Sequence, residues 1–499
     1  MRESVLAIDQ GTTSSKALLI DPTTLEVLAS AARVLAVTSP RPGWVEQDPT
    51  RVWESVRESA AEVLAKRPDV RAVAVAISNQ RESVVMWDGP TGLPIGPLVS
   101  WQDQRGVDLC RRLSTPDNVA LVDQRTGLEL NAMYSAAKMR WLVDQAKGRD
   151  GVRIGTVDAW LLDRLTGGRT YAIEAGNASR TLLFDIAKLS WDSDLCSLFG
   201  VPESVLPEVR PSSGPWGTTR GVSGIPDGLP ILAILGDSPA ALFGHWALAP
   251  DYAAAGKATY GTGSSIMVPA HGVGERRSGV SLTLAWLLDE PLWAYEANIL
   301  YSGSGMDWLG KILGVAGGRG LSELAAGTTD SAGAVFVPAL NGLGAPWWEP
   351  DAVGTLTGLT FRTERSDLAR AGLESVAHQV CDVLDTMDPG KELGLLHVGG
   401  GATASDLLMQ VQANLLGREL LVAAVADISP LGVGALAGVG LGIHPIAQAA
   451  HPVRFLPDPA FTPERRHDER TRWRNALASA GVTPSSTNTK PQHQEGAAT

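Results

Sequence analysis

The sequence contains little cysteine. Three cysteines, Cys110, Cys196 and Cys381, are scattered through 499 residues. They match no metal-binding spacing, and each lies beside hydrophobic or helical sequence. This pattern excludes a domain built on disulfides and a cysteine zinc site, and it predicts three reduced core residues of a cytoplasmic protein.

Positive charge is also scarce. Acidic residues outnumber basic residues by 54 to 42, which gives a formal net charge of -12. Proteins that bind nucleic acids or anionic membranes present basic surfaces to them. The charge balance therefore predicts that neither nucleic acid nor a membrane is a partner.

Long apolar runs are missing as well. The apolar run near the N-terminus covers residues 5–8 before Asp9 interrupts it, which is too short for the core of a targeting peptide. The most apolar long region, residues 420–443, is interrupted by Asp427, Pro430 and several glycines. It suits a buried helix better than a membrane span. We expect no targeting segment and no membrane-spanning helix.

The chain centre carries a buried strand with a carboxylate at its end. Residues 230–235 are apolar and none is charged, which is typical of a strand buried on both faces. They run directly into Gly236 and Asp237. Ser238 and Pro239 then have the character of a helix start. This predicts Asp237 on a turn facing a helix N-terminus, where it could act as a general base. The alternative is that Asp237 merely caps the helix.

The first eighty residues predict a strand meander, a helix and a further strand. The predicted strands are residues 4–8, 17–20, 27–37 and 71–77, and a helix is expected to open at Asp48 and Pro49. A meander that feeds a helix differs from the simple alternation of a dinucleotide-binding fold.

The predicted turn at residues 9–16 has phosphate-binding chemistry. Its Gly11, Thr12, Thr13 and Ser14 offer backbone N–H groups and hydroxyls, while Lys16 adds positive charge. Asp9 in the same loop could hold a hydrated magnesium ion. The alternative is an ordinary polar hairpin turn. No G-x-x-x-x-G-K-[ST] string occurs, which excludes a P-loop protein.

The second half repeats this pattern. A strand at 255–259, a Gly/Thr/Ser turn at 260–265 and a strand at 266–268 predict an internal duplication, with two related domains that hold a nucleoside triphosphate in the cleft between them. Further on we expect a helix capped by Ser366, a strand at 395–398, a glycine turn at 399–401 and a helix at 404–416. The string G-x-G-x-x-A at 432–437 follows no strand directly, so it predicts close helix packing rather than nucleotide binding.

Ten sequence blocks together resemble the FGGY carbohydrate kinases of the actin-like ATPase superfold, and within them the glycerol kinases. The blocks are DQGTTSSK, SNQRES, WQDQR, TGLELNAMYSAAKMRWL, GTVDAWLLDRLTGG, NASRTLLFDI, GDSPAALFG, TYGTGSS, NGLGAPWW and GGGATASDLLMQVQANLLG. The resemblance implies an α/β protein of two actin-like (ribonuclease H-like) domains with a nucleotide cleft between them. We expect an N-terminal domain at 1–245, a C-terminal domain at 246–455 and an extension at 456–499 that is disordered from about 484.

The resemblance also implies roles for individual residues. Asp237 is similar to the catalytic base that takes the proton from the substrate hydroxyl. The positions similar to substrate contacts are Arg81, Glu82, Trp101, Tyr134, Asp237, Ser238 and Ser265. The positions similar to nucleotide contacts are Thr12, Thr13, Ser14, Lys16, Thr262, Gly303, Asp307, Gly401 and Ser405. The implied cofactors are ATP and Mg²⁺, with Asp9 toward the metal, and the implied assembly is a homo-oligomer, a dimer or a tetramer.

The chain departs from the glycerol kinase pattern at the substrate pocket. Ser238 and Pro239 stand where glycerol kinases typically place two glutamines, and Ser265 stands where they place phenylalanine. Loss of an amide and an aromatic wall enlarges the pocket, which favours a longer or differently substituted polyol. At the nucleotide positions the chain has Gly399 for aspartate, Ser405 for asparagine and Lys16 for arginine, and these changes bear on nucleotide affinity.

The sequence therefore predicts ATP-dependent phosphorylation of a primary hydroxyl of glycerol or a related polyol. Two alternatives remain open. A ketose kinase, similar to xylulokinase, would keep the same machinery and change the pocket. A non-enzymatic actin-like ATP switch would share the hairpins but would not need Arg81, Glu82 or Asp237.

Overall fold

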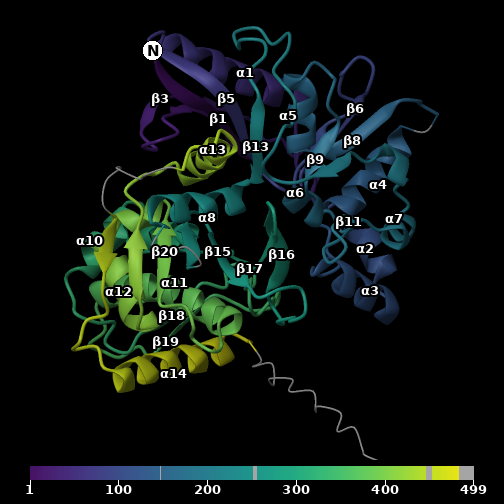
Figure 1. Cartoon of the computed structure of the whole chain (residues 1–499). Coiled ribbons are helices and arrows are strands. Elements are labelled where there is room, and N and C mark those ends of the chain that lie inside the picture. The colour runs from purple at the N-terminus through teal and green to yellow at the C-terminus, as the bar shows by residue number, and fades with distance from the viewer. Residues whose placement is uncertain (147, 251–254, 445–451, 483–499) are drawn as a thin grey trace, which may run out of the picture.

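The computed structural model describes residues 1–146, 148–250, 255–444 and 452–482. Figure 1 shows two halves, each built around its own sheet, with helices α8 (Asp237–Leu248) and α13 (Ile428–Gly440) between the sheets. The predicted disordered segment from about 484 lies outside the described residues.

The first sheet has the strand order β13-β5-β1-β2-β3. Its strands are β1 (Arg2–Gln10), β2 (Ser14–Ile20), β3 (Val27–Val34), β5 (Val70–Asn79) and β13 (Ile231–Gly236). β1, β2 and β3 form the predicted antiparallel meander, and β5 and β13 run parallel to β1. The central residues of β1, β5 and β13 are almost completely buried, as the apolar runs predicted, whereas β3 at the sheet edge is mostly half-buried or exposed.

The first hairpin is tighter than predicted. The expected turn at 9–16 was wrong in length, because the pairs Asp9 with Lys16 and Gln10 with Ser15 continue the ladder and leave a turn of three residues. Asp9, Ser14 and Lys16 therefore lie on strands. The third strand also ends at Val34, before the predicted position 37.

The second sheet repeats the arrangement of the first. Its order is β16-β17-β15-β14-β20-β21-β22. β14, β15 and β17 form an antiparallel meander, and β20 and β21 run parallel to β14, which confirms the predicted duplication. The strands are β14 (Gly256–Tyr260), β15 (Ser264–Ala270), β16 (Ser281–Leu287), β17 (Pro291–Ile299), β20 (Leu395–Gly399), β21 (Glu419–Val422) and β22 (Val453–Phe455).

Smaller elements surround the first sheet. A separate sheet of four short strands in this half has the order β4-β7-β6-β8. The strands are β4 (Glu46–Gln47), β6 (Val84–Asp88), β7 (Leu98–Val99), β8 (Val152–Thr156), β9 (Ala172–Glu174), β10 (Phe184–Asp185), β11 (Ser190–Trp191) and β12 (Glu208–Arg210). The helices are α1 (Pro49–Lys66), α2 (Val107–Leu113), α3 (Pro116–Thr126), α4 (Ser135–Gln145), α5 (Val157–Leu165), α6 (Ala175–Ser179) and α7 (Ser193–Phe199). Asp48 caps α1 through the N–H of Thr50, as its sequence predicted.

The central helix α8 begins two residues earlier than predicted, because Ser238 and Pro239 were expected as its cap and first residue. Gly236 is its N-cap and Asp237 is its first residue, so the expectation of Asp237 on a turn was wrong. Helix α13 packs against α8 through glycines. A Cβ atom at Gly432 would lie 1.9 Å from the carbonyl oxygen of Ala240, so the two backbones approach more closely than any side chain permits. This confirms the helix-packing role predicted for the 432–437 string.

The remaining helices belong to the second half. They are α9 (Gly303–Ile312), α10 (Gly317–Ala325), α11 (Arg365–Met387), α12 (Asp406–Leu416) and α14 (Pro463–Ser479), together with the short strands β18 (Val335–Val337) and β19 (Thr355–Thr357).

Two of these helix starts differ from the prediction. Ser366 lies inside α11 and does not cap it. Glu364 is the N-cap, one residue before the helix, and it forms a reciprocal capping box with Asp367 in the first turn. α12 begins at Asp406 instead of 404, because residues 401–404 form a 3₁₀ turn and Ser405 caps the helix.

The cysteines lie in the core as predicted. All three are buried free thiols, and burial raises the pKa of Cys110 to about 11 and the pKa of Cys196 and Cys381 to about 12. Among the described residues, no helix is long and apolar enough to cross a membrane.

Candidate active site

Asp237 lies where the first sheet meets the second half of the chain. It follows β13 and opens α8, and about half of its side chain is exposed. Its Oδ1 accepts hydrogen bonds from the backbone N–H of Ser238 at 2.7 Å and from Nε of Arg81 at 3.1 Å. Gly236 occupies the N-cap position, so Asp237 is not the N-cap residue, although its carboxylate accepts one N–H of the first turn of α8. A carboxylate held from one side and open on the other can accept a proton from a bound hydroxyl.

Arg81 ties Asp237 to the second half of the chain. Its Nη1 and Nη2 donate to the two carboxylate oxygens of Glu296, on β17, at 2.8 and 2.5 Å. Both side chains are buried, with 7% and 1% exposure. A guanidinium has five N–H groups, and these contacts with Glu296 and Asp237 use three of them. The other two N–H groups of Arg81 have no hydrogen-bond acceptor among the described residues.

Arg180 completes the buried charge cluster. Its Nε donates to Oε1 of Glu82 at 2.7 Å, and its Nη1 lies 3.3 Å from Oε2 of Glu296. Burial by itself would raise the pKa of Glu296, but the charges of Arg81 and Arg180 outweigh burial and hold that pKa well below its usual range. The structure therefore brings Arg81, Glu82 and Asp237 together, although Arg81 and Glu82 pair with different partners.

Sequence reasoning missed Arg180 and Glu296 as site residues. Arg180 lies in the NASRTLLFDI block, so a signal for it was present. Glu296 sits at an unremarkable position of a strand, and nothing local distinguishes it from other strand carboxylates. Its role arises from a contact 215 residues along the chain.

Tyr134 lies between the two halves. Its hydroxyl lies 3.1 Å from that of Ser281 on β16, and its ring lies below the guanidinium of Arg180 at 5.0 Å. A cavity of about 370 Å³ opens here and is lined from the first half by Trp101 and Tyr134 and from the second by Ser281 and Trp348. Indole Nε1 of Trp101 also donates to Oγ1 of Thr12 at 3.0 Å, which joins this cavity to the first hairpin. A cavity of this size is suitable for a small ligand.

Ser238 and Ser265, which the sequence predicts to line the same pocket, lie side by side. Their hydroxyl oxygens are 3.0 Å apart, and the buried Nζ of Lys257 donates to Oγ of Ser265 at 3.1 Å. Burial lowers the pKa of Lys257 to about 8, so most of it is protonated at pH 7. Because an ammonium group only donates, Ser265 accepts from Lys257. The Ser265 hydroxyl keeps a second lone pair and its own proton, so either serine can donate to the other. Sequence reasoning missed Lys257.

Asp9 has the environment of a cation ligand. Burial raises the pKa of Asp9 to about 6, and the charge of Asp237 adds to this shift. Lys16 is engaged by Oδ1 of Asp427 at 2.5 Å. Among the described residues, no cluster of three or more His, Cys, Asp or Glu side chains forms a metal site. Magnesium needs one or two carboxylates and keeps several waters, so Asp9 fits it.

The predicted nucleotide residues form two groups. In the first half, Oγ1 of Thr12 lies 3.4 Å from Oε1 of Gln80, and Leu35 donates its N–H to the carbonyl of Thr13. In the second half, the N–H of Gly303 donates to Gly261 at 2.9 Å, beside Thr262. A Cβ atom on Gly303 would lie 2.5 Å from the carbonyl oxygen of Gly261, so this contact requires glycine.

Asp307, Gly401 and Ser405 lie in the second half near α10. Asp307 accepts the N–H of Gly318 at 2.7 Å, and the hydroxyl of Ser405 lies 2.7 Å from that of Ser322. Gly401 is exposed with open space around it. Among the described residues, no hydrogen bond or ion pair joins this group to Thr12, Thr13 or Ser14. The group with Thr12, Thr13 and Ser14 lies in the first half of the chain, and the group with Asp307, Gly401 and Ser405 lies in the second.

Comparison with known proteins gives a family match across both halves. The model of the N-terminal domain of the FGGY family of carbohydrate kinases matches residues 4–244, and that of the C-terminal domain matches residues 256–441. The chain is 42% identical to apulose kinase of Pectobacterium atrosepticum over 494 residues, which cover 96% of this chain and 99% of that one. It is 40% identical to glycerol kinase of Citrifermentans bemidjiense, with 95% of this chain and 98% of that one covered.

Solved structures show the same fold. The crystal structure of Plasmodium falciparum glycerol kinase with ADP matches with a TM-score of 0.89 at 28% identity, covering 97% of this chain and 99% of that one. Xylulose kinase of Rhodospirillum rubrum matches with a TM-score of 0.82 at 24% identity, covering 95% of this chain and 98% of that one.

Proposed function

The chain belongs to the FGGY family of carbohydrate kinases, and from that premise we propose that it transfers the γ-phosphoryl group of ATP to a primary hydroxyl of glycerol or a related polyol. The observation that carries the proposal is Asp237, a half-exposed carboxylate that Arg81 holds at 3.1 Å beside the Ser238 and Ser265 hydroxyls. A switch protein has no use for this arrangement, which disfavours the ATP-switch alternative.

In the proposed mechanism Asp237 accepts the proton of the attacking hydroxyl. The two unused N–H groups of Arg81 donate to neighbouring substrate hydroxyls, and Glu82 accepts from them through the oxygen that Arg180 does not occupy. Trp101 and Tyr134 form walls of the cavity that receives the carbon chain. Phosphoryl transfer depends chiefly on positioning and charge neutralisation, so a rigid set of donors is the appropriate catalyst.

ATP is proposed to lie between the two hairpins. Its phosphates contact Thr12, Thr13, Ser14 and Lys16 from one half and Thr262 and Gly303 from the other. Asp307, Gly401 and Ser405 are proposed on its nucleoside side. Asp9 is proposed to hold Mg²⁺, which supplies positive charge to the phosphates when bound. Asp9 is partly buried and its pKa is raised by desolvation, and a nearby cation would stabilise its charged form.

A ketose kinase is the second candidate, and the two pocket hydroxyls are compatible with it. The hydroxyls of Ser238 and Ser265 can each donate or accept a hydrogen bond. They can therefore pair with a ketone oxygen, which only accepts, or with a polyol hydroxyl, which accepts or donates. A relative named apulose kinase, alongside relatives named glycerol kinase, supports a substrate range wider than glycerol.

A substrate panel distinguishes these possibilities. ADP release is measured with glycerol, erythritol, threitol and several ketopentoses, with a substrate-free reaction as the background. Turnover of polyols supports the first proposal, and turnover of ketoses alone supports the second. Substrate-independent ATP hydrolysis with no sugar or polyol product would overturn both.

The pocket serines are expected to set chain-length preference. If Ser238 and Ser265 border the far end of the substrate, Ser238→Gln with Ser265→Phe fills that end and shifts kcat/KM toward glycerol over the tetritols by about tenfold, since such polar contacts are worth on the order of 1 to 3 kcal/mol. The matched control, Ser238→Ala with Ser265→Ala, removes the hydroxyls without filling the space. An unchanged ratio of kcat/KM values in the Gln/Phe variant contradicts the enlarged-pocket argument.

Assembly and location complete the proposal. We propose two domains at 1–245 and 246–455, which the family-model limits of 4–244 and 256–441 support. The resemblance to glycerol kinases supports a homo-oligomer of two or four chains in the cytoplasm. Light scattering coupled to size-exclusion chromatography measures the mass that decides between these states.

A further inference from the structure

A second cavity lies in the outer part of the second half. It has a volume of about 350 Å³ and opens between the end of α11, the end of α12 with the start of β21, and α14. Figure 1 shows α14 on the side of the second half remote from the first sheet, so the cavity is separate from the candidate active site. The basic side chains that line it are Lys391, Arg418, Arg466, His467, Arg470 and Arg474. Asp385 is its acidic lining residue.

The wall formed by α14 is fixed in place. The fully buried Trp473 donates its indole N–H to Oδ2 of Asp382, on α11, at 2.8 Å and stacks on His378 with ring centroids 5.0 Å apart. Arg470 donates to Oδ1 of the same carboxylate at 2.5 Å. A shared buried carboxylate with two donors sets the rotation of α14 against α11. The cavity is therefore preformed, and a ligand need not order it.

The cavity carries more positive charge than its own carboxylates balance. Arg470 faces Asp382 and Asp385, and Arg418 faces Asp388 at 2.7 Å. In the described part of the chain, no carboxylate lies within 4.0 Å of the charged atoms of the three remaining cations, which are Lys391, Arg466 and Arg474. Five permanent cations therefore face three carboxylates in a protein whose net charge is -12.

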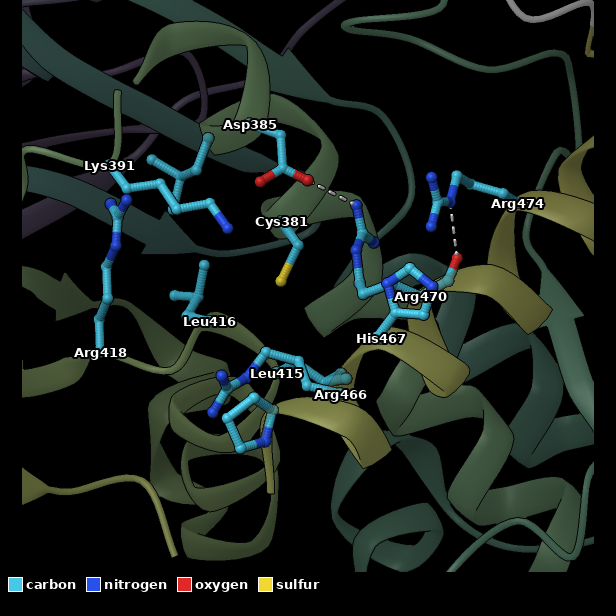
Figure 2. Close-up of a pocket in the computed structure, with 12 residues that line it drawn as sticks. Cys381, Asp385, Lys391, Leu415, Leu416, Arg418, Arg466, His467, Arg470 and Arg474 are labelled. Carbon is cyan, nitrogen blue, oxygen red and sulfur yellow. Dashed lines mark hydrogen bonds and ion pairs between the residues drawn. The ribbon is translucent and has the colours of Figure 1, made fainter. Parts of the chain in front are cut away.

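The cations approach the cavity from opposite sides. Figure 2 shows the unpaired Lys391 with the paired Arg418 on one side, and the unpaired Arg474 with the paired Arg470 on the other, with Cys381 between them. Nε of Arg466 donates to the backbone carbonyl of Asn414 at 2.7 Å, which holds the stem of that side chain while its terminal N–H groups stay available. Convergent cations without counter-charges repel one another, so an anion between them lowers the energy of the folded protein.

The floor of the cavity is apolar. Leu384, Leu415 and Leu416 line it together with Cys381. Guanidinium forks match phosphate oxygens in pairs, while an apolar floor accommodates a carbon skeleton. A volume near 350 Å³ suits a small metabolite. We propose that this cavity binds a small organic phosphate, with the phosphate between Lys391 and Arg474 and the carbon part against the leucines.

Isothermal titration calorimetry on the full chain tests the proposal. The probes are inorganic pyrophosphate and glucose 6-phosphate, both titrated in the presence of saturating ADP so that the proposed nucleotide site is already filled. We expect one equivalent of glucose 6-phosphate to bind. In the Lys391→Gln, Arg474→Gln variant its Kd should rise at least tenfold. Both side chains lack a carboxylate partner, so their removal leaves no buried charge unpaired and the melting temperature should not fall.

The matched control removes the same charge from the same region. In Arg465→Gln with Arg472→Gln, both changes lie on α14, at side chains that face Asp330 and Glu469 instead of the cavity. This variant should bind glucose 6-phosphate like the wild type. Absence of binding to the wild type overturns the proposal, as does equal weakening in both variants, which would show a general effect of charge. Binding of pyrophosphate but not of glucose 6-phosphate overturns the organic part of the assignment.

Discussion

Replacement of Asp237 by asparagine is expected to abolish most phosphoryl transfer without unfolding the protein. Asparagine has nearly the same shape and keeps an oxygen that accepts from Ser238 and Arg81, so the start of α8 should survive. It cannot accept the proton of the attacking hydroxyl. General-base catalysis is worth roughly 10²- to 10⁴-fold, and loss of the charge that orients the hydroxyl adds to it. We expect kcat to fall by at least about 10²-fold.

The control for this prediction is Asp108→Asn. Asp108 is an exposed carboxylate on α2, paired with Arg111 at 2.7 Å, and its loss should leave kcat unchanged. Melting temperatures of both variants show whether the fold persists. If Asp237 served only the helix start, Asp237→Asn would change stability slightly and keep activity. Retention of more than about a tenth of the wild-type kcat therefore removes Asp237 from the role of base.

The strands at the sheet centres could be predicted because their chemistry is local. Residues 72–77 and 230–235 are apolar without interruption, and such a short run is typical of a strand buried on both faces. The repeat of strand, turn and strand in the two halves then gave the duplication. Helix α14 was not predicted, because about half of its residues are charged and its buried apolar residues are confined to Trp473, Ala476 and Leu477.

The candidate site was predictable where side chains act at a turn or strand end and not where they act across the halves. Thr12 and Asp237 stand at such positions and within the DQGTTSSK and GDSPAALFG blocks. Glu296 and Lys257 lie on strands of ordinary pattern, and each contributes through contacts with distant residues or a neighbouring strand. The sequence pattern predicts that a strand is buried, but it does not predict which charged side chain a buried strand residue contacts.

Glu296 is expected to be the most important carboxylate for stability near the site. Its replacement by alanine leaves Arg81 and Arg180 buried beside each other without their shared counter-charge. Removal of one member of a buried ion pair costs about 3 to 5 kcal/mol, and here two guanidinium groups lose the same partner. We expect Glu296→Ala to unfold at much lower urea concentration, and to lose activity because Arg81 no longer holds Asp237.

The matched comparison isolates this charge. Glu296→Gln keeps one acceptor oxygen and should recover part of the stability, while Glu290→Gln, at an exposed position next to β17, should behave like the wild type. The pH dependence follows from the lowered pKa of Glu296. A carboxylate with a depressed pKa in the folded state stabilises that state above its unfolded pKa of about 4.3, and this contribution declines as the pH falls below that value. The gap in unfolding free energy between wild type and Glu296→Gln should therefore narrow below about pH 4.3. A gap that stays constant from pH 7 to pH 3.5, or a Glu296→Ala protein as stable as the wild type, would show that the two arginines do not depend on this charge.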